Sequence, residues 1–336
     1  MVSMKDISLK CGVSIATVSK ALNDHSDIGA ETKIKIQRVA REMGYLPNSS
    51  ARALKTNRTH NLGVLFVDAA RSGLKHDYFA NVLDSFKVTA EENGYDITFI
   101  NCNKEHQTMT YLEHGRYRGV DGVVIACVDF EDPQVIELVR SEIPVVTIDH
   151  SFEMKTSVVS DNVEGMRELT DYVCDMGHTR IAYIHGDDTS VTRNRLASFN
   201  HTLEVRGIAP DYDLQKAGKY RDTKESYKYT NELLELKDPP TCILYSDDYS
   251  LIGGLNAIKE KGLSVPEDIS VAGYDGLGIA MVLKPAVTSF KQDTEKLGSV
   301  AAQKLITSIE RPKSSIVERI LIEGKLIKGE TVKKIK

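Results

Sequence analysis

Residues 3–24 read SMKDISLKCGVSIATVSKALND, and this stretch decides the N-terminal fold because it divides into two short helices around a glycine. Ser3 is suited to cap the first helix, with Asp6 three residues further on in an acidic version of the capping box. Gly12 supplies the positive φ that a tight turn between two crossed helices requires. A second helix follows over residues 15–23. The stretch therefore predicts a helix-turn-helix pair.

A third helix is predicted over residues 31–43, and Gly44 is placed to end it as a C′ glycine. Apolar residues at helical spacing give each helix one face for a shared core. The residues predicted to build that core are Met4, Ile7, Cys11, Val18, Leu22, Ile36, Val39, Ala40 and Met43. Three short helices of this kind favour a DNA-binding domain whose second helix enters the major groove by its N-terminal residues. The alternative is a small three-helix bundle with no ligand.

Charge is distributed unevenly along the chain. The whole chain has a net charge of −5, yet residues 1–58 hold ten Lys and Arg against five Asp and Glu. A basic head on an acidic body indicates that only the head meets a polyanion such as DNA. Chance clustering is the alternative explanation of the charges alone.

From residue 61 onward the pattern changes to alternating strands and helices. One series of apolar strands is predicted at 61–67, 95–100, 122–128 and 144–149, and a second at 180–186, 241–248 and 269–275. Continuous apolar strands with helical crossovers form parallel sheets that are covered on both faces. Two series predict two lobes, and ligands of such folds lie beyond the C-terminal ends of the strands.

Polar residues collect at these strand ends, namely Asp149, Asp161, Arg195, Asp247, Asp248 and Asp275. Several carboxylates facing one arginine suit a neutral polyhydroxylated ligand, because hydroxyls donate to carboxylates, whereas their oxygens accept from guanidinium. For Asp161 and Asp248, capping of a helix explains the residue at least as well as ligand binding does.

Length and composition narrow the class of protein. A chain of 336 residues predicts two or three domains, and 41% hydrophobic with 27% charged residues is typical of a soluble globular protein. No apolar run reaches 18 residues and no secretory signal is recognised, so a cytoplasmic protein without a membrane span is expected. Five scattered cysteines predict neither a disulfide framework nor structural zinc.

Sequence patterns of several enzyme classes are absent, including G-x-S-x-G, GxxxxGK[ST] and H-E-x-x-H. Gly276 and Gly278 begin a dinucleotide fingerprint, but Met281 stands at the third glycine position. We therefore expect no enzyme activity, no cofactor and no metal. A small-molecule binding or transport component is the rival, since its body would look the same, but it would lack a basic head.

Further motifs recur along the chain in a fixed order. In the head they are KDI (5–7), GVSIATVSKALN (12–23), GYLPN (44–48) and ARAL (51–54). In the body they are DGVVI (121–125), IPVVTID (143–149), GHTRIAYI (177–184), RLASF (195–199), SDDYSLIGGLNAI (246–258), VPEDISVAGYD (265–275) and TSFKQD (288–293). In order and spacing they resemble the lactose-repressor/galactose-repressor (LacI/GalR) family of bacterial transcription regulators, over essentially the whole chain.

This resemblance implies a small all-α helix-turn-helix head plus an α/β body with the two-lobed parallel sheets of type I periplasmic-binding-protein-like folds. The head is expected at 1–46, a hinge helix and linker at 47–60, and the effector-binding body at 61–336. Within the body, the N-lobe is expected at about 61–159 and 290–318, and the C-lobe at about 160–289 and 319–336.

The resemblance also implies roles for single residues of the head and hinge. Base-reading positions are Ile15, Ala16 and Lys20, phosphate contacts are Ser14, Thr17, Ser19 and Asn23, and the hinge helix supplies Arg52, Leu54 and Lys55. Leu54 falls where paired leucines enter the minor groove and kink the duplex. The family often has Arg at position 20, and Lys makes the bidentate fork to guanine less well, so the operator sequence is not predicted.

In the body, the resemblance implies that Arg195, Asp247 and Asp275 contact the effector, while Tyr220 falls near an aromatic that often stacks on a sugar face. Loop 69–79, AARSGLKHDYF, is about five residues longer than the family pattern. It is expected at the cleft mouth, either contacting or closing over the effector, or as a solvated surface excursion.

Together these features predict a homodimeric regulator, or a tetramer, that represses a carbohydrate-utilisation operon. Its partners would be pseudopalindromic double-stranded operator DNA and a small-molecule effector, expected to be a sugar, bound between the lobes. Residues 47–55 are too few for a helix that is stable alone, so their folding is expected to depend on DNA and on the spacing of the two bodies. Family members use the effector either as inducer or as corepressor, and both remain open here.

Overall fold

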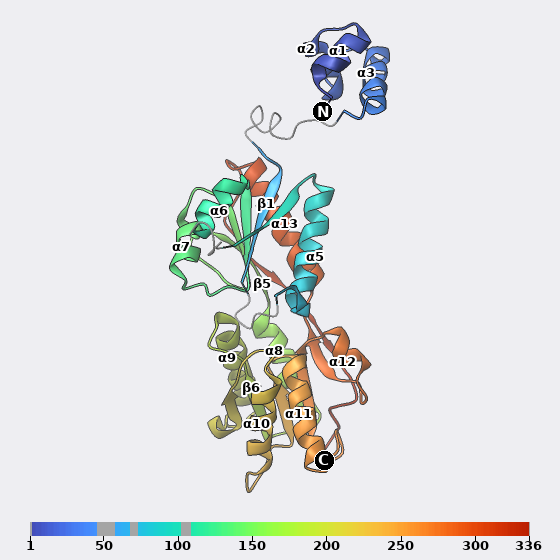
Figure 1. Ribbon diagram of the computed structural model, residues 1–336. Coiled ribbons are helices and arrows are strands. Elements are labelled where there is room, and N and C mark those ends of the chain that lie inside the picture. Colours follow the sequence, from blue (N-terminus) through green and yellow to red (C-terminus); the bar gives the residue numbers. More distant parts are fainter. Residues whose placement is uncertain (1, 46–57, 68–72, 102–108, 336) are drawn as a thin grey trace. The chain divides into compact units, whose positions relative to one another are not determined.

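Figure 1 shows the computed structural model of the chain, which describes residues 2–45, 58–67, 73–101 and 109–335. The chain divides into a head, Met1–Thr59, and a body, His60–Lys336. None of the helices in the described residues combines the length and the apolar character that crossing a membrane requires.

The head contains the three predicted helices, α1 (Met4–Cys11), α2 (Ile15–Leu22) and α3 (Ala30–Glu42). The predicted capping box is confirmed: the Ser3 hydroxyl accepts from the backbone N–H of Asp6, and the Asp6 carboxylate accepts from the backbone N–H of Ser3 at 2.8 Å. Gly12 and Gly44 both adopt positive φ, 70° and 67°, as a turn and a helix end require.

The head core is the predicted one. Ile7, Val18 and Ile36 are fully buried, one from each helix, and the partly buried Met4, Leu22 and Met43 pack around them. α3 lies one residue earlier at each end than predicted, with Met43 as its C-cap.

The body contains two sheets, each with six strands in the described residues. The first sheet has the order β11 (Arg319–Ile322), β5 (Thr156–Ser160), β4 (Val145–Ile148), β3 (Gly122–Ala126), β1 (Asn61–Phe66), β2 (Asp96–Ile100). The second has the order β12 (Lys325–Ile327), β10 (Thr288–Lys291), β9 (Ser270–Asp275), β8 (Cys242–Tyr245), β6 (Ile181–His185), β7 (Gln215–Ala217). The pairs are parallel except for β10 with β12, so the predicted α/β architecture is confirmed.

Helices cover both sheets (Figure 1). The first lobe carries α5 (Asp77–Glu92), α6 (Tyr111–Arg118), α7 (Pro133–Arg140) and α13 (Thr294–Glu310), with the short 3₁₀ turn η1 (Gly73–Lys75) before α5. The second carries α8 (Asn162–Asp175), α9 (Ser190–Val205), α10 (Thr223–Leu234), α11 (Asp248–Glu260) and α12 (Gly278–Val282), with η2 (Tyr212–Leu214) leading into β7.

α5 and α13 pack together closely at a glycine. A Cβ on Gly298 of α13 would lie 2.1 Å from the Val82 carbonyl oxygen of α5, so no larger residue fits there. Buried side chains of both helices, including Phe86 and Leu305, join the core of the first sheet. This packing fixes the start of α5, which carries part of the site described below.

The lobe boundaries differ from the prediction near the C-terminus. Residues 319–322 were expected in the C-lobe, but β11 pairs in parallel with β5 of the first sheet, with Ile320 beside Val158. Residues 290 and 291 were expected in the N-lobe, but they end β10 of the second sheet. Short strands take their sheet from partners far away in the sequence, and the local pattern carries no such information.

Candidate functional site

The predicted DNA-contacting residues of the head lie on and beside α2. Ser14, Ile15, Ala16, Lys20 and Asn23 are exposed, whereas Thr17 and Ser19 are partly buried. The Ile15 side chain is 48% exposed at the first turn of the helix, although buried Val18 lies only three residues later. An apolar side chain displayed in this way is suited to contact a thymine methyl group.

Local hydrogen bonds order this face. The Ser14 hydroxyl caps α2 by accepting from the backbone N–H of Thr17 at 3.0 Å, and the two hydroxyls lie 2.9 Å apart. Asn23 closes the other end by donating its side-chain amide to the Ser19 carbonyl at 2.7 Å. The N-terminus of α2 also carries the positive end of the helix dipole, which favours a phosphate there.

Lys20 is paired within the head. Its Nζ lies 2.5 Å from Asp27 Oδ2, and this hydrogen bond lowers the pKa of Asp27 below its usual value. Asp27 lies in the loop between α2 and α3 and was not among the predicted site residues. The predicted hinge residues Arg52, Leu54 and Lys55 lie outside the described residues.

In the body, three predicted residues, Asp149, Arg195 and Asp275, meet in one group with four residues that were not predicted. We call it the strand-end cluster: Tyr78, Asp149, Asn162, Arg195, Tyr274, Asp275 and Gln292. Asp149 directly follows β4 of the first sheet, and Asp275 is the last residue of β9 of the second. The cluster therefore draws on both lobes.

Arg195 is the buried cation of the cluster, with a side chain from α9 and only 3% of the residue exposed. Its Nε donates to Asn162 Oδ1 at 2.7 Å, and its Nη1 donates to the Ser246 carbonyl at 3.0 Å. The guanidinium carbon lies 3.6 Å from the centre of the Tyr274 ring, which is cation–π geometry. A buried charge needs this many partners because its desolvation is costly.

Asp149 sits in a left-handed conformation, φ 58°, which turns the chain at the end of β4. Its Oδ2 accepts from the Tyr78 hydroxyl at 2.7 Å, and its Oδ1 accepts from the backbone N–H of Ser160 at 3.0 Å. Burial raises the pKa of Asp149, while these hydrogen bonds and Arg195 lower it. The net direction is upward.

Asp275 also has positive φ, 95°, and accepts from Gln292 Nε2 at 2.6 Å. Burial raises the pKa of Asp275 to about 7, Arg195 opposes this, and the neighbouring carboxylates Asp247 and Asp149 add to it. Near neutral pH this carboxyl is therefore able both to donate and to accept hydrogen bonds.

Asp247 caps the helix for which Asp248 was the candidate cap, and an effector contact of Asp247 remains a prediction. Asp247 is the N-cap of α11, accepting from the backbone N–H groups of Tyr249 and Ser250, and it also holds the backbone N–H of Arg221 at 2.9 Å. Asp248, for which capping explained the residue at least as well as ligand binding, is 1% exposed and accepts from the backbone N–H of Leu277 at 2.7 Å. The reason is that α11 begins at Asp248, one residue earlier than a cap at Asp248 would allow.

Asp161 is the N-cap of α8, accepting from the backbone N–H of Glu164 at 3.0 Å, so the capping explanation accounts for it. Tyr220 donates or accepts at 2.8 Å with the Thr192 hydroxyl. Its ring lies close to Gly186, where a Cβ would come within 2.3 Å of a ring carbon. Tyr220 is therefore packed into the second lobe, and its stacking on a ligand remains a prediction.

Loop residues 75–77 contact the other lobe. The Tyr249 hydroxyl, on α11, donates to Asp77 Oδ2 at the start of α5. Arg221 Nη2 donates to the Lys75 carbonyl at 3.4 Å, and its guanidinium lies 4.0 Å over the Tyr249 ring. We call these four residues the interlobe clasp.

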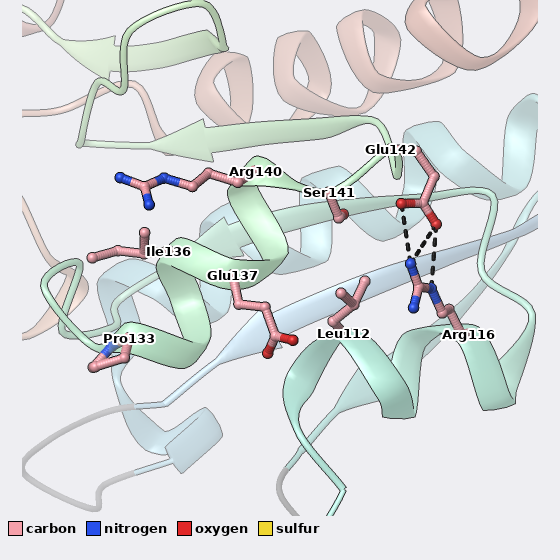
Figure 2. A pocket seen from close by; sticks show the side chains of 8 residues that line it. All are labelled: Leu112, Arg116, Pro133, Ile136, Glu137, Arg140, Ser141 and Glu142. Carbon is pink, nitrogen blue, oxygen red and sulfur yellow. Dashed lines mark hydrogen bonds and ion pairs between the residues drawn. The ribbon is translucent and has the colours of Figure 1, made fainter.

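A pocket of about 610 Å³ lies elsewhere, on the surface over α6 and α7 of the first lobe. Figure 2 shows the side chains that line it. Arg116 and Glu142 form an ion pair at its edge, with Nη2 2.8 Å from Oε1. None of the predicted effector residues lines it.

Sequence reasoning missed Tyr78, Asn162, Tyr274 and Gln292. Each was adjacent to a predicted residue or inside a quoted motif: Tyr274 precedes Asp275, and Gln292 lies in TSFKQD. For Asn162, Tyr274 and Gln292, proximity to a strand end was therefore the available signal, but it does not say which neighbour turns inward.

Two family models match the chain. The model of bacterial regulatory proteins of the lacI family matches residues 3–48, and that of the periplasmic binding protein-like domain matches residues 170–332. A probable HTH-type transcriptional repressor, ExuR of Bacillus subtilis (strain 168), is 30% identical over 339 residues, covering 100% of this chain and 99% of the relative.

Solved structures share the same architecture. The lac repressor dimer bound to operator and the anti-inducer ONPF has a TM-score of 0.83 at 25% identity, covering 99% of each chain. The complex of the transcriptional regulator CelR with cellobiose has a TM-score of 0.72 at 24% identity, covering 98% of this chain and 100% of the other.

Proposed function

The chain belongs to the lacI family of bacterial regulatory proteins and is a DNA-binding transcriptional repressor, and from this premise we propose that it controls a carbohydrate-utilisation operon in response to a sugar. The observation that carries the proposal is the strand-end cluster, in which buried Arg195 and two carboxyls from different lobes converge. The proposed setting is the cytoplasm.

The proposed DNA complex contains two heads on the half-sites of a pseudopalindrome, supplied by a homodimer. Ile15 and Ala16 contact base edges through their apolar surfaces, and Lys20 reads an acceptor. Ser14, Thr17, Ser19 and Asn23 hold phosphates. Support comes from their position at the N-terminus and exposed face of α2. The hinge roles of Arg52, Leu54 and Lys55 belong to the same proposal.

The proposed effector is a neutral polyhydroxylated molecule. Hydroxyl groups donate to Asp149 and Asp275 and accept from Arg195. Asp275, with a pKa of about 7, adapts to either hydrogen-bond polarity of a sugar hydroxyl. The fold of CelR, which is similar, accommodates cellobiose.

We propose that the affinity for operator DNA depends on how the two lobes are arranged relative to each other. An effector that binds one arrangement better shifts its population, and the interlobe clasp is one group of contacts that such a shift would break or make. A bias of about 3 kcal/mol against paired hinges lowers operator affinity roughly 150-fold. An inducer and a corepressor act through the same coupling with opposite sign.

The test has two stages. Wild-type chain is used to select duplexes from a random pool, and the selected duplex is then titrated with and without sugars, nucleosides and sugar phosphates that raise the melting temperature of the protein. We expect a pseudopalindrome to be enriched and a sugar to change its Kd at least tenfold. Enrichment of no sequence refutes operator binding, and a response to nucleosides alone refutes the sugar.

A further inference from the structure

Two acidic residues after α2 each hold a lysine, but in different settings. Lys33 Nζ lies 2.8 Å from Asp24 Oδ1 and also donates to the Asp24 carbonyl, and the lysine side chain is only 18% exposed. Lys20 Nζ lies 2.5 Å from Asp27 Oδ2, and their side chains are 49% and 53% exposed. The first pair links the loop to α3. The second pair is exposed to solvent, and its lysine is itself a predicted base-reading residue.

We propose that Asp27 is a specificity-determining residue for DNA recognition, because its carboxylate controls which acceptors Lys20 is free to contact. The inference rests on the proposed binding of operator DNA through α2. It assigns to Asp27 a positioning role that acts through Lys20.

A lysine ammonium is a compact charge on a flexible stem, and alone it is attracted to any phosphate as readily as to guanine. The ion pair of Lys20 and Asp27 has no net charge, and the Asp27 carboxylate repels a phosphate that approaches Lys20. The attraction that makes binding independent of sequence is therefore reduced at this position.

The same pair remains compatible with a base edge. The ammonium has three N–H donors, so one can stay on Asp27 while the others reach O6 or N7 of guanine. The amino group of the paired cytosine is a donor that a nearby carboxylate accepts. Asp27 thus penalises the wrong contacts more than the right one, which is how a repulsive element produces specificity.

The test uses the full-length chain and two matched substitutions, Asp27→Asn and Asp24→Asn. Both remove one negative charge from the same loop, but only the first releases Lys20. Affinities are measured on the duplex selected by wild type and on a scrambled duplex, each over a range of salt concentrations.

For Asp27→Asn we expect roughly fivefold tighter binding to the scrambled duplex at low salt and a salt slope steeper by about 0.9 per head, because a released lysine neutralises one phosphate. Binding to the selected duplex should change less than about twofold. For Asp24→Asn, the ratio of the two affinities should stay within about twofold of wild type, since Lys20 keeps its partner.

A second readout separates positioning of Lys20 from a structural role. When selection is repeated with Asp27→Asn and with Lys20→Met, the same base pair of each half-site should lose its preference, and Asp24→Asn should relax none. The inference is overturned if Asp27→Asn leaves the preference at every base pair unchanged, or weakens it at a base pair other than the one that Lys20→Met affects. It is also overturned if the ratio of the affinities for the selected and the scrambled duplex stays at its wild-type value. If the wild-type protein selects no sequence, the proposed operator binding is refuted, and with it the inference about Asp27 that rests on it.

Discussion

The two binding regions of this chain are built in opposite ways. The predicted DNA contacts of the head fall within residues 14–23, and the hydrogen bonds of their side chains within the described part of the chain go to residues at most seven positions away. The strand-end cluster joins residues as distant as Tyr78 and Gln292, 214 positions apart, and its arginine is buried while its two carboxyls are partly buried. One exposed helix is enough to present groups to a polyanion, whereas surrounding a small ligand requires the whole fold.

This difference has a consequence for substitutions. A residue on the open face of α2 contributes to binding without supporting the head core, which is made by Ile7, Val18, Ile36 and their neighbours. A residue of the strand-end cluster is at once a ligand contact in our proposal and a structural partner of other buried groups. Substitutions on the open face of α2 should therefore change DNA binding with little change in stability, whereas substitutions in the strand-end cluster should change both effector binding and stability.

The largest effect is expected for Arg195→Met, which removes the buried cation and leaves Asn162, the Ser246 carbonyl and two carboxyls without it. We expect the free energy of unfolding to fall by about 3–5 kcal/mol, as when one partner of a buried charge network is lost. Urea titration followed by circular dichroism measures this.

Arg193→Met is the matched control for that experiment, because Arg193 lies on the same helix but is exposed and pairs only with the exposed Asp188 among the interactions of the described residues. Its substitution should cost less than about 1 kcal/mol. Equal losses for the two variants would show that the cluster is not held together by Arg195.

The next effect concerns the hinge. Leu54→Ala should weaken binding to the selected duplex by about 2–3 kcal/mol and reduce its bend, since an apolar wedge is needed to unstack a base step. Gel mobility of circularly permuted fragments measures the bend, and thermal unfolding of the protein should be unchanged. Wild-type affinity together with a wild-type bend angle would exclude the wedge.

A smaller effect is expected on the pH dependence of stability, to which Asp275 of the strand-end cluster contributes. The folded pKa of Asp275 is about 7, against about 3.9 in an unfolded chain. Between these values the folded protein binds a proton that the unfolded chain does not, so the contribution of Asp275 to stability falls as pH rises from 4 to 7.

Asparagine does not ionise, so the melting temperature of Asp275→Asn relative to wild type should increase between pH 5 and pH 8. The increase is on the order of 2–4 °C for each kcal/mol involved. Asp188→Asn makes the same change at an exposed position outside the cluster and is the control. Parallel profiles for Asp275→Asn and wild type over this range would mean that Asp275 titrates normally.

The same contrast between local and distant contacts explains what the sequence could predict. The capping box of Ser3, the turn at Gly12 and the core stripe of α3 depend on residues a few positions apart, and all were predictable. The strand ends at Asp149 and Asp275 were predictable too, because apolar runs stop there.

What escaped prediction depends on distant contacts or on a single-residue shift. The assignment of β11 to the first sheet requires pairing with β5, about 160 residues away. The inward positions of Asn162 and Gln292 depend on segments that connect the two lobes. Asp248 rather than Asp247 was the candidate cap of α11 because the start of a helix is read from a pattern only to within a residue or two.

The smallest effect should come from the interlobe clasp, which lies between the two extremes: its contacts are long-range, but its side chains are only partly buried. Tyr249→Phe removes the hydroxyl that donates to Asp77 and keeps the ring beneath Arg221. We expect contacts between the lobes to weaken by about 1 kcal/mol, because one hydrogen bond is lost while both groups gain access to water. Hydrogen exchange of the backbone at residues 75–80 should accelerate roughly fivefold.

Tyr227→Phe is the control, since its hydroxyl donates to Glu260 within the second lobe, and it should leave exchange at 75–80 unchanged. Equal exchange at 75–80 in both variants and wild type would mean that the Asp77 contact does not restrain the lobes.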